Sequence, residues 1–290
     1  MINAAISPLI SLFLGISLFV AYILLGKYLV LSMPIIQLVF FYHVISSLIN
    51  LVEIRLSLRK KIKFDQLGIQ LLMSLVYLGF ILCFFGSLSQ LPLVSAVAIY
   101  LAYPLFVPWI LKIWMGKRLN IPIIIGSYIV WAGMVFSFNH KLQLNNVLVI
   151  VAIFGSIFKA IYQTGYARLR VSEAPLILWA TKFLTTLVAS ALLLVGSWTM
   201  PHWQKLLTLL LLCFIEKGYR ICFKICTINY NLLKATNLFN SSIFVCGALD
   251  YFIYQSILPF KSILCAVLIY LGIFFTFLQK NVLSNSVYDL

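Results

Sequence analysis

The chain alternates between long apolar runs and short polar turns, and this pattern repeats ten times. About 20 apolar residues carry a helix across the hydrocarbon core of a bilayer, and most of the runs reach that length. The runs are apolar on all sides and do not alternate as lipid-facing strands would, so they predict helices. The predicted spans are 6–26, 34–54, 67–88, 92–111, 121–139, 147–167, 174–198, 205–228, 232–254 and 260–279.

Prolines mark where several spans begin and where one of them bends. A proline lacks the backbone N–H, and this loss costs least in the first turn of a helix. The prolines at such positions are Pro34, Pro92, Pro122 and Pro175. Within the fourth span, Pro104 and Pro108 predict a kink, because a proline inside a helix removes a backbone hydrogen bond.

The chain also repeats itself with a shift of 139 positions, close to half of its 290 residues. Phe19, Ala21, Gly26 and Ala96 recur as Phe158, Ala160, Gly165 and Ala235, and Ser17 and Gly133 recur as Ser156 and Gly272. We therefore expect two five-helix repeats, 1–140 and 141–290, with a short cytoplasmic tail after the second. Five spans per half is an odd number, so the second half enters the membrane from the opposite side. The predicted fold is an all-α integral membrane protein with ten transmembrane helices in two inverted repeats.

Composition and charge place this chain in a membrane and away from nucleic acid. Hydrophobic residues make up 63% of the sequence and charged residues 9%, far fewer charges than the roughly 25% of soluble domains. The net charge of +15 comes largely from basic residues between spans, which act as topology signals. The largest cluster is Arg55, Arg59, Lys60, Lys61 and Lys63, and the opposite loops hold only Lys27, Lys141, Lys205 and Lys261. The predicted location is the inner cell membrane, multi-pass, with both termini cytoplasmic.

A fourth-span segment and the turn that follows it carry a resemblance to a known family. The segment runs from Leu91 to Pro108 and is rich in small residues; the turn reads Gly116-Lys117-Arg118-Leu119, and Gly133 follows in the fifth span. With these features the chain resembles the drug/metabolite transporter superfamily, and within it the EamA-type ten-span transporters. The family's usual glutamate in the turn is Lys117 here, and Tyr254 to Ile257 in the second half also lack the acid. The resemblance implies a permease fold and transport, and it assigns no role to an acid in these turns.

Ionisable residues enter the spans of the second half where the first half is apolar or uncharged. In the eighth span these are Glu216, Lys217, Arg220 and Lys224, which match Tyr77, Leu78, Ile81 and Phe85 under the shift. Lys159 matches Val20, and Lys182 matches His43. Charges at membrane depth mark substrate or ion pathways by default. Glu216 and Arg220 are four residues apart and suit a direct ion pair, which could alternatively be only a structural bridge.

Uncharged polar residues accompany these charges. We predict substrate contacts by Lys159, Glu216, Lys217 and Arg220, with Tyr162, Gln163, Asn237 and Asn240 as hydrogen-bonding walls. For the asparagines, hydrogen bonding between helices is an equal alternative. We expect the cavity among the first, third, fourth, sixth, eighth and ninth spans.

The function expected from this pattern is secondary transport of a small polar metabolite by alternating access. Mixed charge favours a zwitterionic amino acid or a derivative, and organic anions such as sugar phosphates or nucleotide derivatives are the alternative. A coupling proton or an exchanged solute would be the second partner, with lipid around the protein. The sequence has no P-loop, catalytic triad or metal-ligand spacing, so we expect no enzyme activity, no cofactor and no metal. A lipid-modifying membrane enzyme and a non-transporting scaffold are the rivals from other classes. Transport direction, coupling and oligomeric state stay open.

Overall fold

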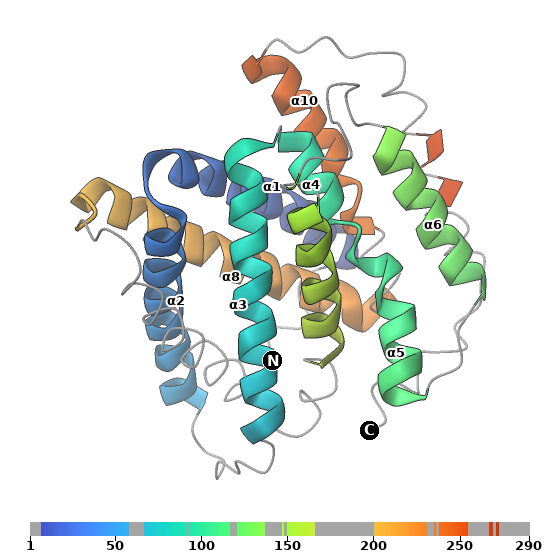
Figure 1. Cartoon of the computed structure of the whole chain (residues 1–290), viewed down its shortest axis with the longest axis horizontal. Coiled ribbons are helices and arrows are strands. Elements are labelled where there is room, and N and C mark those ends of the chain that lie inside the picture. The colour runs from blue at the N-terminus through green and yellow to red at the C-terminus, as the bar shows by residue number, and fades with distance from the viewer. Residues whose placement is uncertain are drawn as a thin grey trace.

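The computed structural model describes residues 7–57, 67–91, 93–116, 121–136, 147, 150–165, 200–230, 235, 238–254, 267–268 and 271–272. These residues are helical almost throughout, and no strand occurs among them (Figure 1). The prediction of an all-helical chain is therefore confirmed over this part. The seventh predicted span, with Lys182, and nearly all of the tenth lie outside the described residues.

The first three helices match the first three predicted spans. They are α1 Pro8–Ser32, α2 Ile35–Ser57 and α3 Leu67–Gln90. The side chain of Ser7 caps the start of α1 by accepting a hydrogen bond from the N–H of Ile10. α1 ends just before Pro34, which cannot continue a helix.

Two lysines that we expected in outer loops lie inside helices. Lys27 belongs to α1, and its ammonium donates to the carbonyl oxygen of Leu91 at 2.6 Å. Lys205 belongs to α8, Trp203–Tyr230, and donates to the carbonyl oxygen of Ser32. For Lys27 the predicted loop position was wrong, because a long lysine side chain can reach carbonyls at the end of a neighbouring helix, so its charge does not end its own helix. Lys205 agrees with the predicted eighth span, which began at this residue.

The fourth predicted span is broken, as its prolines predict. α4 covers Leu93–Tyr100, a 3₁₀ turn labelled η2 covers Tyr103–Leu105, and α5 covers Val107–Met115. α5 ends at Gly116, which takes the left-handed conformation with φ of 62°. The fifth predicted span is α6, Ile121–Phe136, and the sixth is the apolar helix Ile150–Gly165.

The ninth predicted span is interrupted as well, which we did not expect. Asn240 and Ser241 form a turn, and α10 begins only at Ser242 and runs to Tyr254. The hydroxyl of Ser241 donates to the carbonyl oxygen of Leu238 at 2.6 Å. Serine and asparagine side chains compete in this way with helical backbone bonds, so this helix breaks without a proline.

The two breaks lie at equivalent positions, 139 residues apart. Leu101 and Ala102 form the first turn, and Asn240 and Ser241 form the second. At the first break the N–H of Leu105 donates to the carbonyl of Ala102 at 3.1 Å. At the second, the N–H of Phe244 donates to the carbonyl of Ser241, also at 3.1 Å. The two donors, Leu105 and Phe244, are 139 residues apart, and so are the two acceptors, Ala102 and Ser241.

Two of the helix–helix contacts are related by the same shift of 139 positions. α1 lies along α8: the hydroxyl of Ser11 donates to the carbonyl oxygen of Cys222, and the far ends meet through Lys205 and Ser32. Helix Ile150–Gly165 lies along α3, where Gly155 faces Cys83 (Figure 1). α1 thus packs against α8, and helix Ile150–Gly165 packs against α3.

Two aromatic clusters fill corresponding places in the core. Phe80, Phe84 and Tyr100 form one cluster, with ring centroids 4.6 to 6.2 Å apart. Tyr219, Phe223 and Phe239 form the other, with centroids 5.1 to 6.0 Å apart. Every ring of the second cluster lies 139 positions after a ring of the first. Phe19 of α1 bridges the clusters by contacting Tyr100 and Tyr219.

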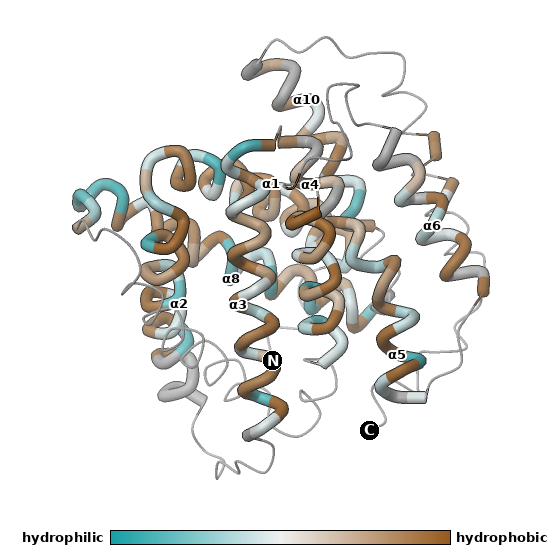
Figure 2. Tube along the Cα trace, viewed as in Figure 1, coloured by the Kyte–Doolittle hydropathy of each residue, from teal (hydrophilic) through white to brown (hydrophobic). Residues whose placement is uncertain are grey.

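The outward surface of the described helices is apolar. On α8, Leu207, Leu211 and Phe214 are half exposed, whereas Glu216 on the same helix is 5% exposed. Figure 2 shows apolar residues along most of the helices and polar residues interrupting α8. Three stretches of the described chain are long and apolar enough to cross a membrane: Pro8–Ser32, Gly68–Gln90 and Ala96–Trp114.

Candidate functional site

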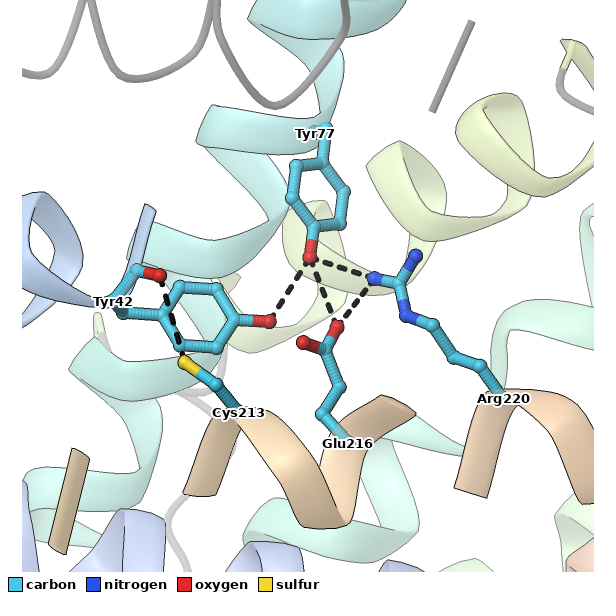
Figure 3. A network of polar contacts seen from close by, with 5 residues as sticks. All are labelled: Tyr42, Tyr77, Cys213, Glu216 and Arg220. Atoms are coloured by element: carbon cyan, nitrogen blue, oxygen red, sulfur yellow. Dashed lines mark hydrogen bonds and ion pairs between the residues drawn. The ribbon is translucent and has the colours of Figure 1, made fainter. Parts of the chain in front are cut away.

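A buried polar network joins α8 to α2 and α3 in the middle of the apolar core. The guanidinium of Arg220 lies 2.5 Å from the Oε1 atom of Glu216, so the predicted ion pair is confirmed (Figure 3). The hydroxyl of Tyr77 on α3 lies 3.2 Å from the same carboxylate oxygen and 2.7 Å from Arg220. Tyr42 on α2 adds a fourth member, with its hydroxyl 3.1 Å from that of Tyr77.

The direction of each hydrogen bond in this network follows from the chemistry of its members. Arg220 can only donate, and the carboxylate of Glu216 can only accept. The single proton of Tyr77 points to Glu216, so its oxygen accepts from Arg220 and from the hydroxyl of Tyr42. Tyr42 is fixed in turn, since the thiol of Cys213 contacts its backbone carbonyl at 3.6 Å. The network therefore holds the carboxylate and the guanidinium in one arrangement.

The two charges differ in their access to the surface. The side chain of Glu216 is 7% exposed and that of Arg220 is 29% exposed. The carboxylate thus depends on Arg220 and Tyr77 for its stabilisation, and the guanidinium keeps part of its surface open. The ring of Tyr77 also lies under Arg220, 5.5 Å from the guanidinium carbon, which adds a cation–π contact.

A second charged position lies on helix Ile150–Gly165. Lys159 is 6% exposed, and its ammonium has no hydrogen-bond partner within the described part of the chain. It lies 3.3 Å from the ring centroid of Tyr100 and 3.9 Å from that of Tyr103. These two tyrosines flank the break between α4 and η2, so the lysine faces the interrupted helix of the first half.

The break of the second half also has buried polar atoms. Asn240 is 1% exposed and Ser242 is fully buried. The Oδ1 atom of Asn240 and the hydroxyl of Ser242 have no hydrogen-bond partner among the residues that the structure describes. Each interrupted helix thus has a buried polar group beside it.

The remaining predicted site residues are placed as follows. Tyr162 is buried, and its ring lies 4.6 Å from that of Tyr77, which brings it to the polar network. Gln163 and Lys217 are half-buried on helix Ile150–Gly165 and on α8. Asn237 lies outside the described residues. The structure therefore brings Glu216, Arg220 and Tyr162 together around Tyr77, and places Lys159 beside the first break.

Sequence reasoning missed the tyrosines that surround the charges: Tyr42, Tyr77, Tyr100 and Tyr103. A signal existed for Tyr77, because it is the residue that matches Glu216 under the 139 shift. When two halves are related by a twofold axis, matching residues touch only on that axis. For Tyr100 and Tyr103 the signal was their place beside the proline-induced break.

Comparisons with known proteins inform the fold and leave the function open. No protein-family model matches the sequence, and no curated protein is significantly similar to it. One protein of known crystal structure superposes with a TM-score of 0.71 and 14% identity, over 92% of this chain and 95% of that chain. At this identity the likeness concerns the fold alone. It extends over nearly the whole length of both chains.

Proposed function

We propose that this protein is a secondary transporter of a small polar metabolite, in first place a zwitterionic amino acid or a derivative of one. The observation that carries the proposal is the pair of interrupted helices at Leu101–Ala102 and Asn240–Ser241. Interrupted membrane helices in corresponding positions of two halves form the substrate and ion sites of many secondary transporters, because the unwound backbone offers polar groups at membrane depth.

The proposed architecture is two inverted repeats of five spans each, 1–140 and 141–290, in a multi-pass inner-membrane protein. The reciprocal packing of α1 on α8 and of helix Ile150–Gly165 on α3 supports a twofold relation, since a twofold axis exchanges the partners of each contact. The contact between Tyr77 and Glu216, 139 residues apart, supports an axis that passes near them. The apolar outer face of α8 supports a surrounding bilayer.

The proposed substrate region lies between the breaks and includes the charges of the second half. Burying Lys159, Glu216 and Arg220 in an apolar helical protein is costly, and the first half has Val20, Tyr77 and Ile81 in their places. A fold that needed only stability could have kept uncharged residues there in both halves. This difference supports a role for the charges in binding a polar solute.

Counterflow in proteoliposomes tests the proposal. The purified protein would be reconstituted and loaded in turn with amino acids, their derivatives, and sugar phosphates, and exchange for the radiolabelled compound would be measured. We expect protein-dependent exchange of at least one amino acid or derivative. Asn240→Leu, which places the first-half residue at the second break, should lower the exchange rate at least tenfold, and Tyr28→Phe on the exposed surface of α1 should not. Exchange no faster than in empty liposomes for every compound would overturn the proposed function.

A further inference from the structure

Lys159 stands in an environment that leaves its charge incompletely stabilised. An ammonium has three N–H donors. None of them has a hydrogen-bond partner within the described residues, and the side chain is nine-tenths buried. Buried charges are normally paired and hydrogen-bonded, because the interior cannot replace the water they lose. An anion that accepts hydrogen bonds from this ammonium would stabilise the charge, and the described residues do not supply one.

Glu216, a buried carboxylate of the described chain, is already engaged. Glu216 is bound by Arg220 at 2.5 Å and accepts a hydrogen bond from Tyr77. If Glu216 paired with Lys159 instead, the guanidinium of Arg220 would lose its carboxylate partner. Lys159, Arg220 and Glu216, taken by themselves among the described residues, carry a net charge of +1, so one further negative charge would balance these three side chains.

Two aromatic ring faces contact the ammonium of Lys159. The rings of Tyr100 and Tyr103 lie 3.3 and 3.9 Å from it, within cation–π range. A ring face attracts a cation without using its N–H donors. The ammonium is thus fixed in position and keeps its donors available, and it lies at the break between α4 and η2.

We propose that Lys159 is the anchor for a carboxylate group of the transported solute, a proposal that rests on the function proposed above. A carboxylate carries the single negative charge that would balance Lys159, Arg220 and Glu216, and its oxygens accept hydrogen bonds from the ammonium. A phosphate dianion would exceed that charge. Tyr100 and Tyr103 act as positioning residues, because they hold the ammonium at the interrupted helix.

Ligand-dependent thermal stability of the full-length protein in detergent tests this anchor. The probes are amino acids, lactate and succinate, each compared with the amide in which the carboxylate is replaced, and inorganic phosphate. We expect carboxylates to stabilise the parent protein and the matched amides to have no effect. Lys159→Met should weaken the apparent affinity for carboxylates at least tenfold. Lys159→Arg keeps the charge and should retain part of the affinity, and Lys112→Met on the exposed side of α5 is the control and should retain all of it.

The outcomes separate the anchor from the transport function. Stabilisation by amides equal to that by carboxylates, by phosphate alone, or unchanged in Lys159→Met overturns the anchor. So does a parent that no carboxylate stabilises. A carboxylate that stabilises the parent through Lys159 and does not cross the membrane in counterflow overturns transport and leaves the anchor standing. A solute that Lys159→Met exchanges at the parental rate overturns the anchor and leaves transport standing.

Discussion

At the scale of single residues, the hydroxyl of Tyr77 is the centre of the polar network. Its oxygen takes part in three contacts, with Tyr42, Glu216 and Arg220. A buried carboxylate that loses a hydrogen-bond donor keeps its desolvation penalty and loses part of its compensation. The stability of the two charges therefore depends on an uncharged side chain from another helix.

Tyr77→Phe should destabilise the protein by about 1–3 kcal/mol, since it removes that donor and leaves the ring in place. The measurement is the midpoint of thermal unfolding in detergent. Tyr28→Phe is the matched control, because Tyr28 is 58% exposed on α1. Equal midpoints for the two variants would show that the network does not stabilise the fold.

Glu216→Gln should cost more than Tyr77→Phe, about 3–5 kcal/mol, because it leaves the guanidinium of Arg220 without its counter-charge. The double variant Glu216→Gln/Arg220→Met removes both charges and should recover part of the loss. A double-mutant cycle over the four proteins measures the coupling between the two side chains. Additive losses would mean that the 2.5 Å contact contributes no net stability.

At the scale of helices, glycines set how closely neighbours approach. A Cβ atom at Gly155 would lie 2.9 Å from the Cβ of Cys83, which is attached to the backbone of α3 and cannot rotate away. At Gly86, on α3, a Cβ would meet nothing within 4 Å. The two positions thus separate the effect of close packing from the general preference of helices for alanine.

Gly155→Ala and Gly86→Ala should change stability in opposite directions. The first forces two helices apart and should cost about 1–3 kcal/mol. The second should stabilise by up to about 1 kcal/mol, because alanine is the better helix former. Unfolding midpoints of the two variants against the parent check both signs. A stable Gly155→Ala variant would contradict the close packing of helix Ile150–Gly165 on α3.

The sequence predicted helices where the signal was local. The apolar runs placed α2, α3, α6 and α8 to within three residues at each end, and α1 runs six residues beyond its predicted end. The prolines located the break after α4. The four-residue spacing of Glu216 and Arg220 predicted their ion pair. These features depend on neighbours along one helix, so one helix is enough to show them.

Contacts between distant helices were not predictable in the same way. The tyrosines around Lys159 and Glu216 come from α2, α3, α4 and η2, and no local pattern tells which ring of an aromatic-rich chain faces a charge. The break at Asn240 was missed because it has no proline. The run Asn240-Ser241-Ser242 could have indicated it, since these side chains compete with backbone hydrogen bonds.

At the scale of the whole molecule, the basic clusters predict the orientation in the membrane. Reporters fused after Leu290 and inserted after Lys61 should both read cytoplasmic, and one inserted after Lys141 should read external. Alkaline phosphatase and green fluorescent protein fusions give complementary readouts. A cytoplasmic signal from the Lys141 position would contradict the predicted inverted orientation of the second half.

The contact between Tyr77 and Glu216 bears on how this protein could have evolved. If a single five-helix gene was duplicated, its product had to pair with an identical copy, and the residue on the symmetry axis then faced itself. Two glutamates there would have repelled each other, whereas two tyrosines could share a hydrogen bond. On this history, fusion of the copies would have freed the two positions to differ, and an acid could then face the phenol that binds it. On the proposed twofold relation, a symmetric dimer could not have acquired this charged centre by a single substitution without placing two like charges in contact.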